Sequence, residues 1–135
     1  EQAIPVFRRV LEFDLGIYQA HSRLADMYEA AGEWDGALAE RRRAVETNLD
    51  EAEPLLELAT TLLRAERVAE AMDALARAEA LNGRDARIPF RRAALAAAVG
   101  DRALAVSSYE RFLAIAPSRM GEQIAEARRH LAAPQ

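Results

Sequence analysis

Cysteine and lysine are both absent from this chain of 135 residues, and all 18 basic residues are arginine. The lack of cysteine excludes disulfides, thiolate nucleophiles and cysteine-based metal sites. The lack of lysine excludes the phosphate-binding lysine of a P-loop and the Schiff bases that lysine forms with carbonyl substrates. Arginine without lysine, beside abundant alanine, indicates a GC-rich genome and favours a bacterial source.

Long apolar runs are absent too, since none reaches the length that a membrane-spanning helix needs, and we expect no direct membrane insertion. The net charge of −4 gives no reason to expect nucleic acid as a partner. The charge is uneven, because residues 1–67 hold 14 acidic residues and 8 arginines, whereas residues 68–135 hold 8 and 10. Such a gradient can orient an asymmetric partner. The compartment stays open.

Residues that could carry catalysis are few and scattered. His21 and His130 lie far apart, and His21 falls on an inward apolar stripe, where we expect a packed histidine without the carboxylate or second histidine that a catalytic or metal site needs. Ser107 and Ser108 have no histidine nearby, so a serine nucleophile is unsupported. We therefore predict no catalytic residue, no metal site and no cofactor, and the chain is not expected to be an enzyme.

A small residue returns at a constant interval, and this decides the expected fold. The interval of 34 residues separates each neighbouring pair among Ala3, Ala37, Ala71 and Ala105. Larger residues keep the same phase, including Phe7, Leu75 and Tyr109 four places after three of these alanines. Turn residues recur as well: Gly32 and Gly100 stand five places before their alanines, and Pro117 stands twelve after the last one.

This pattern resembles the tetratricopeptide repeat, which pairs an aromatic- and leucine-containing first helix with an A-x3-F second helix followed by proline. The resemblance covers nearly the whole chain. It implies an all-α fold, a right-handed superhelical solenoid of antiparallel helix pairs with three full repeats, a leading half repeat and a C-terminal capping helix. Small residues let the two helices of a pair approach closely, and the larger apolar residues form the stripe that is buried.

The period places the elements along a single domain, 1–135. We expect a half repeat at 1–17, full repeats at 18–51, 52–85 and 86–119, and a cap at 120–132. The expected helices cover 3–14, 18–31, 34–48, 52–65, 68–81, 86–99, 102–115 and 120–132. Because the sequence begins in mid-repeat and without methionine, we interpret it as a fragment of a longer protein. Glu66 stands where neighbouring repeats have glycine, so the sequence indicates its turn by position and not by residue type.

The resemblance also implies a site, since first helices of tetratricopeptide pairs line a concave groove that holds a peptide or a helix. Apolar anchors beside arginines would suit a peptide with apolar and acidic residues. The predicted partner-binding residues are Arg23, Leu56, Thr60, Leu63, Arg64, Arg87, Phe90, Arg91, Ile124 and Arg128. The alternative is that these arginines pair with acidic neighbours such as Glu53 and Glu57.

Several residues depart from the family pattern. Arg41 stands in an aromatic slot, and we expect its stem to lie over the stripe while Arg41, Arg42 and Arg43 form a solvated face with local salt bridges. Arg92 stands where the family usually has a leucine. Either the residue is functional, or the helix shifts slightly and Leu95 and Val99 carry the packing instead. Trp34 is expected to pack against the preceding helix, with a ligand-stacking role as the alternative.

One subclass of the family grips the C-terminal carboxylate of chaperone tails with basic and asparagine residues over three repeats. Only Arg87 and Arg91 match it in type. Ser22 and Asp26 stand where a lysine and an asparagine would be needed, and Glu57 replaces another asparagine. We therefore predict no chaperone-tail clamp.

The favoured hypothesis is a protein–protein interaction module that captures a peptide or helix in a preformed groove. Two alternatives stay open. The chain could be a structural subunit that docks through its convex face or its ends, or the regulatory part of an enzyme whose catalytic domain is absent.

Overall fold

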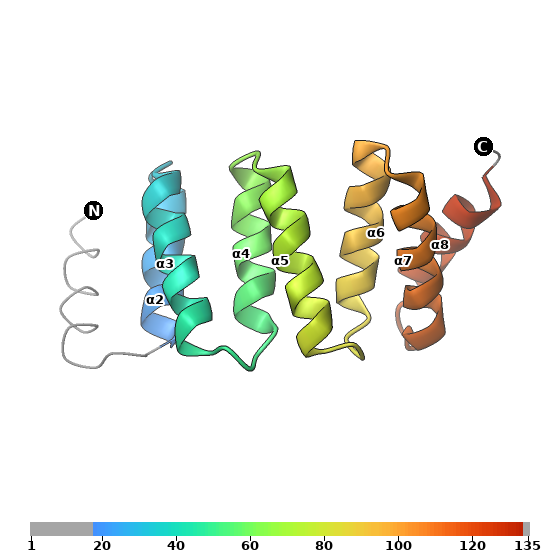
Figure 1. Ribbon diagram of the computed structural model, residues 1–135, viewed down its shortest axis with the longest axis horizontal. Coiled ribbons are helices and arrows are strands. Elements are labelled where there is room, and N and C mark those ends of the chain that lie inside the picture. The colour runs from blue at the N-terminus through green and yellow to red at the C-terminus, as the bar shows by residue number, and fades with distance from the viewer. Residues whose placement is uncertain (1–17, 134–135) are drawn as a thin grey trace. The chain divides into compact units, whose positions relative to one another are not determined.

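The computed structural model describes residues 18–133, and within them the fold is all-helical (Figure 1). The seven described helices are α2 (Tyr18–Ala30), α3 (Trp34–Thr47), α4 (Glu53–Arg64), α5 (Val68–Leu81), α6 (Arg87–Val99), α7 (Arg102–Ile115) and α8 (Gly121–Ala132). Each begins and ends within two residues of its expected range. The helix expected at 3–14 lies outside the described residues.

The chain divides into two compact units, Glu1–Arg77 and Ala78–Gln135, with the boundary inside α5. In unit 1, α2 packs against α3 and α3 against α4; in unit 2, α6 packs against α7 and α7 against α8. Unit 1 holds 16 acidic residues and 9 arginines, whereas unit 2 holds 6 acidic residues and 9 arginines. The charge asymmetry expected from the sequence therefore falls between two compact bodies. The expected single domain stays a prediction.

The periodic alanines lie at the helix contacts, as the 34-residue interval predicts. Ala37 and Ala71 are fully buried and Ala105 nearly so. The absence of a longer side chain lets the neighbouring backbone come close, while leucines fill the space around it. In unit 1 the core includes Leu24, Leu38, Leu55, Leu58 and Leu62. In unit 2 a cluster of Ala86, Ala93, Tyr109, Phe112 and Ala127 is buried.

The turns that join the helices of a pair share one backbone geometry. Gly32, Glu66 and Gly100 all have positive φ, at 74°, 63° and 84°. In each turn this residue's N–H bonds the carbonyl three places back, and the next N–H bonds the one five places back, as in Glu66 to Leu63 and Arg67 to Leu62. This is the Schellman geometry that satisfies the last carbonyls of a helix. Glu66 keeps the turn although it lacks the conformational freedom of glycine.

Candidate functional site

A buried arginine organises the face of unit 1 that α2 and α4 form. Arg41 extends from α3, and its side chain is only 6% exposed. Its Nε donates to the Thr61 hydroxyl at 3.0 Å, and its Nη2 donates to Asp26 at 2.6 Å and to Glu29 at 2.8 Å. Its Nη1 donates to the hydroxyl and the carbonyl oxygen of Ser22 at 3.1 and 3.4 Å. One guanidinium thus joins three helices.

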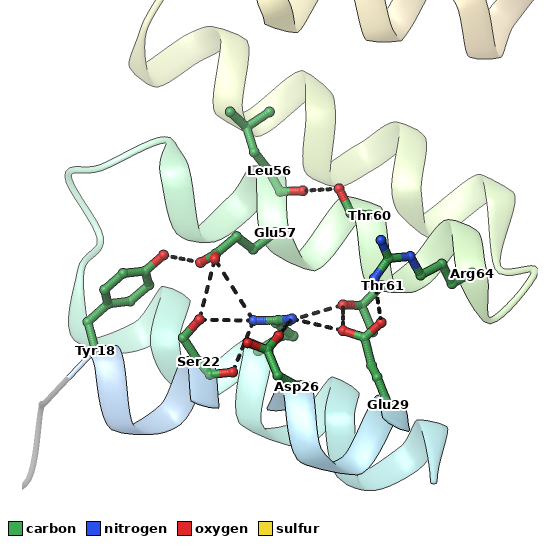
Figure 2. A network of polar contacts seen from close by, with 10 residues as sticks. Tyr18, Ser22, Asp26, Glu29, Leu56, Glu57, Thr60, Thr61 and Arg64 are labelled. Carbon is green, nitrogen blue, oxygen red and sulfur yellow. Dashed lines mark hydrogen bonds and ion pairs between the residues drawn. The ribbon is translucent and has the colours of Figure 1, made fainter. Parts of the chain in front are cut away.

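Acidic side chains converge on this guanidinium from both helices (Figure 2). The Glu57 carboxylate lies 4.0 Å from Arg41 and accepts hydrogen bonds from Tyr18 and from the Ser22 hydroxyl. Asp26 remains 67% exposed although it is held by Arg41, and it therefore presents a fixed carboxylate to solvent. We call Tyr18, Ser22, Asp26, Glu29, Arg41, Glu57, Thr61 and Arg64 the Arg41 network.

The pKa values follow from this arrangement. Burial by itself raises the pKa of Glu29, but hydrogen bonds from Arg41, Thr61 and Arg64 outweigh it and hold that pKa below its usual range. Burial lowers the pKa of Arg41, and its bonds to Glu29 and Asp26 more than compensate and raise it. Both groups are therefore charged at neutral pH, and the face keeps its pattern of charge.

The expectation for the three consecutive arginines is partly wrong. Arg42 and Arg43 are exposed and pair with Glu70 at 3.0 Å and Glu40 at 2.6 Å, as expected of a solvated face. Arg41 is buried instead of lying over the stripe with its head in water. The α2 and α4 hydroxyls and carboxylates replace water around its guanidinium, so burial of the charge is tolerated.

His21 is buried, which confirms its interpretation as a packed residue. The expectation that it has no carboxylate partner is wrong. Its Nδ1 lies 2.8 Å from Glu40, which is itself 1% exposed and also accepts from Arg43. Glu40 was missed because it precedes an arginine run and resembles one more surface acid. The pair lies between α2 and α3, and we assign it to packing.

The predicted site residues of unit 1 differ in their accessibility. Arg23 is exposed and makes no hydrogen bond or ion pair with another described residue. Arg64 is exposed but bonds Glu29 at 3.0 Å. Leu63 is 38% exposed, and half-buried Thr60 donates its hydroxyl to the Leu56 carbonyl at 3.0 Å. Leu56 itself is only 2% exposed, so its prediction as a partner-contacting anchor is wrong: the side chain is part of the core.

In unit 2 the predicted apolar anchors are also committed to packing. Phe90 is half-buried, with its ring centroid 5.0 Å from that of Phe112 and 6.0 Å from that of Tyr109. Ile124 packs, partly buried, against the same cluster. Both side chains therefore belong to the packing of unit 2 while staying partly exposed, and truncating either would disturb the core.

The three arginines of unit 2 that were predicted to bind a partner differ in their contacts. Arg87 grips Asp85 through Nε at 3.0 Å and Nη2 at 2.6 Å, and these bonds hold the pKa of Asp85 below its usual value. Arg91 and Arg128 are exposed and have no hydrogen bond or ion pair to another described residue. Their guanidinium groups are thus exposed to solvent, and the charge of Arg91 adds to the lowering of the pKa of Asp85.

Arg92 forms an ion pair with Glu79, so its guanidinium has a partner within unit 2. Its Nε is buried without a hydrogen-bond partner among the described residues. Val99 is 53% exposed, so it does not carry the packing that an apolar residue at position 92 would supply.

Trp34 is half-buried at the start of α3 and borders a hollow of about 380 Å³ with Asp26, Glu29, Ala30 and Arg64. Packing and ligand stacking are thus both open to its ring. Among residues 18–133, no three histidine or acidic side chains are placed to hold a metal ion. None of the described helices is long and apolar enough to cross a membrane.

Comparison with known proteins agrees with this architecture. Residues 20–55 match the family model described as tetratricopeptide repeat. The fold is similar to that of MamA, at 22% identity and a TM-score of 0.72, covering 96% of this chain and 82% of MamA. No curated protein matches the chain in sequence. The family match covers residues 20–55, and the similar solved structures show that the described helices share the fold of tetratricopeptide repeat proteins.

Two further similar structures contain bound peptides. One is the type III secretion chaperone SycD of Yersinia enterocolitica in complex with a peptide of the translocator YopD, at 15% identity and a TM-score of 0.72, covering 84% of this chain and 88% of that one. The other is the first tetratricopeptide repeat domain of Spaghetti (RPAP3) bound to the HSP90 peptide SRMEEVD, at 22% identity and a TM-score of 0.68, covering 84% and 89%.

Proposed function

We propose that this protein is an interaction module that binds a peptide segment of a partner protein on the faces of the first helices of its repeats. In unit 1 this face belongs to α2 and α4, with Arg23, Thr60, Leu63 and Arg64. In unit 2 it belongs to α6 and α8, with Arg87, Arg91, Arg128 and the exposed edges of Phe90 and Ile124. The peptides bound to two similar structures support this function.

The observation that carries the proposal is the set of exposed arginines without partners. Arg23, Arg91 and Arg128 make no hydrogen bond or ion pair to other described residues; the first two lie on the first helices α2 and α6, and the third lies on the capping helix α8. A guanidinium binds a carboxylate through two parallel hydrogen bonds, which gives orientation as well as affinity. Unit 2 has three more arginines than acidic residues, so its face favours an acidic segment.

The Arg41 network adds preorganisation to the unit 1 face. Because Arg41 fixes side chains of α2 and α4, a partner need not order them on binding, which reduces the entropic cost. Asp26 and Glu57 make this face more acidic than that of unit 2, so we propose that it contacts neutral or basic residues of a partner beside the carboxylate that Arg23 binds.

The test is selection from a phage-displayed library of random peptides. Wild type should enrich peptides with acidic and apolar residues. The variants Arg91→Glu and Arg128→Glu should each bind the selected peptides with an affinity lower by about ten-fold or more, which is the effect of losing one charge-assisted contact. Arg129→Glu is the matched control, because it makes the same charge change at an exposed neighbouring position of α8. Equal losses in all three variants would indicate a general charge effect and would overturn the assignment.

A further inference from the structure

A cleft in unit 2 gathers arginine side chains beyond those of the proposed peptide face. It has a volume of about 320 Å³ and lies between the loop that precedes α6 and the loop that precedes α8. Three of its lining residues are basic and one is acidic: Arg84, Arg87, Arg119 and Asp85. We call it the loop cleft. Among the predicted partner-binding residues, only Arg87 borders it.

The single acid of the loop cleft is committed to one of the three arginines. The Asp85 carboxylate accepts hydrogen bonds from Nε and Nη2 of Arg87 at 3.0 and 2.6 Å, and also from the Arg87 backbone N–H at 3.0 Å. These bonds hold the pKa of Asp85 low, so the carboxylate stays ionised and fixes the guanidinium of Arg87. One arginine is therefore neutralised and held in place.

The other two arginines have no such partner. Arg84 and Arg119 are exposed, and neither side chain makes a hydrogen bond or ion pair with another described residue. Glu122, in the first turn of α8, does not border the cleft, and Glu79 is paired with Arg92 and Arg111. The lining of the cleft thus carries two positive charges in excess of its negative charge.

The loop cleft also has an apolar side. Its wall includes Ile115, Pro117 and Met120, and the first and last of these pack, partly buried, against the core cluster of unit 2. Apolar surface beside a charged site is covered by a ligand that carries an apolar group next to its anion. An inorganic ion leaves that surface in water, so the lining favours an anion that is borne on a peptide.

From the two uncompensated arginines, the fixed Arg87 and the apolar wall we infer that the loop cleft binds a phosphorylated serine or threonine of a partner segment. A phosphate ester carries a charge of about −1.5 to −2 at pH 7 and three acceptor oxygens, so a single residue balances the excess charge. A carboxylate supplies one negative charge.

Each part of the cleft has a role in this complex. Arg84 and Arg119 donate paired hydrogen bonds to the phosphate oxygens, a geometry that suits the planar guanidinium. An apolar residue next to the phosphorylated one lies against Ile115 and Met120. The inference rests on the proposed function in one respect, that the partner is a peptide segment.

The test begins with a degenerate peptide library that has phosphoserine fixed at its centre. The best peptide is then made with phosphoserine, serine or glutamate at that position, and binding is followed by fluorescence anisotropy. The phosphoserine form should bind about ten-fold or more tightly than the serine form, with glutamate between them. Absence of any selected peptide, equal binding of the phosphoserine and serine forms, or inorganic phosphate binding as tightly as the phosphopeptide would overturn the inference.

Arg84→Gln and Arg119→Gln locate the phosphate in the cleft. Both side chains are exposed, so the substitutions should leave the urea midpoint unchanged. Each should weaken the phosphoserine form several-fold and leave the serine form as it is. Arg129→Gln, at an exposed arginine of α8 outside the cleft, is the matched control. A preference for phosphoserine that survives both cleft variants, or that Arg129→Gln reduces equally, would count against the assignment.

The serine form separates this inference from the proposed peptide face. If it binds and is weakened by Arg91→Glu, but phosphorylation adds nothing, the peptide face stands and the loop cleft fails. If Arg91→Glu and Arg128→Glu leave it unaffected, while the preference for phosphoserine still requires Arg84 and Arg119, the loop cleft stands and the proposed face fails.

Discussion

The substitution Arg41→Met tests whether the Arg41 network holds unit 1 together. Methionine has a similar length and tolerates a buried position, so the change removes the guanidinium with little loss of volume. The substitution leaves Thr61, which is fully buried, and Glu29, whose side chain is 9% exposed, without their arginine. Breaking a buried pair by removing one partner costs about 3–5 kcal/mol.

The expected cost is at the lower end of that range. Glu29 keeps its bonds to Thr61 and Arg64, and Asp26 is mostly exposed and returns to water with little penalty. We therefore expect the free energy of unfolding to fall by about 3 kcal/mol. Trp34, the single tryptophan, lies in unit 1 and reports its unfolding in urea by fluorescence.

Arg42→Met is the matched control. Arg42 is exposed, and its one ion pair among the described residues is with the exposed Glu70, so its loss should cost less than about 1 kcal/mol. The double variant of Arg41→Met with Glu29→Gln should be less destabilised than the sum of the two single ones, because the unpaired charge is then removed. Equal effects of Arg41→Met and Arg42→Met would refute the reasoning.

Three further predictions concern a turn, acid and a peptide. Glu66→Gly should stabilise the protein by about 0.5–1 kcal/mol, because relief of the left-handed conformation exceeds the extra flexibility of the unfolded chain; an unchanged urea midpoint would contradict this. The pKa values of Glu29 and Asp85 are lowered in the folded state, so the stability that they contribute is present above about pH 4 and is lost as the pH falls through their folded pKa values. The urea midpoint should therefore fall on acidification, less steeply in Arg41→Met; parallel profiles would be evidence against the Glu29 assignment. The HSP90 peptide SRMEEVD should not bind on the α2 and α4 face, because Asp26 and Glu57 present carboxylates there; micromolar binding in calorimetry that Arg91→Glu and Arg128→Glu leave unchanged would contradict this.

Much of the fold could be predicted because the periodic residues act locally. The 34-residue interval of the alanines follows from a close helix contact that recurs in each repeat, and the helix ranges follow from it. The turn at Glu66 was less certain because glycine marks that geometry in the neighbouring turns. The structure shows that the turn's hydrogen bonds can hold a non-glycine residue there.

The site was harder to predict because burial depends on partners distant in sequence. Arg41 resembles its exposed neighbours in sequence, and only the folded chain brings Ser22, Asp26 and Thr61 around it. One signal was present: Arg41 stands in a slot where the repeat has an aromatic residue, which is an inward position. An inward arginine needs acceptors, so nearby acids on the first helices could have been assigned to it.

Leu56 shows the reverse error, and Phe90, which is half-buried, shows it in part. Both were chosen as exposed anchors because they lie on first helices, but a first helix also packs against its own partner helix. The leucine is buried and the phenylalanine joins an aromatic cluster. Side-chain direction within one turn decides between the two roles, and a pattern of spacing does not resolve it.

The central claim is that a peptide binds on the first helices of the repeats. The most direct measurement is amide chemical-shift mapping of the protein with a peptide selected from the phage library. The account predicts that the perturbed amides lie on α2 and α4 around Arg23 in unit 1 and on α6 and α8 around Arg91 and Arg128 in unit 2, with little change on α3 and α7. Perturbations confined to α3 and α7 would contradict it and would favour docking through the second helices.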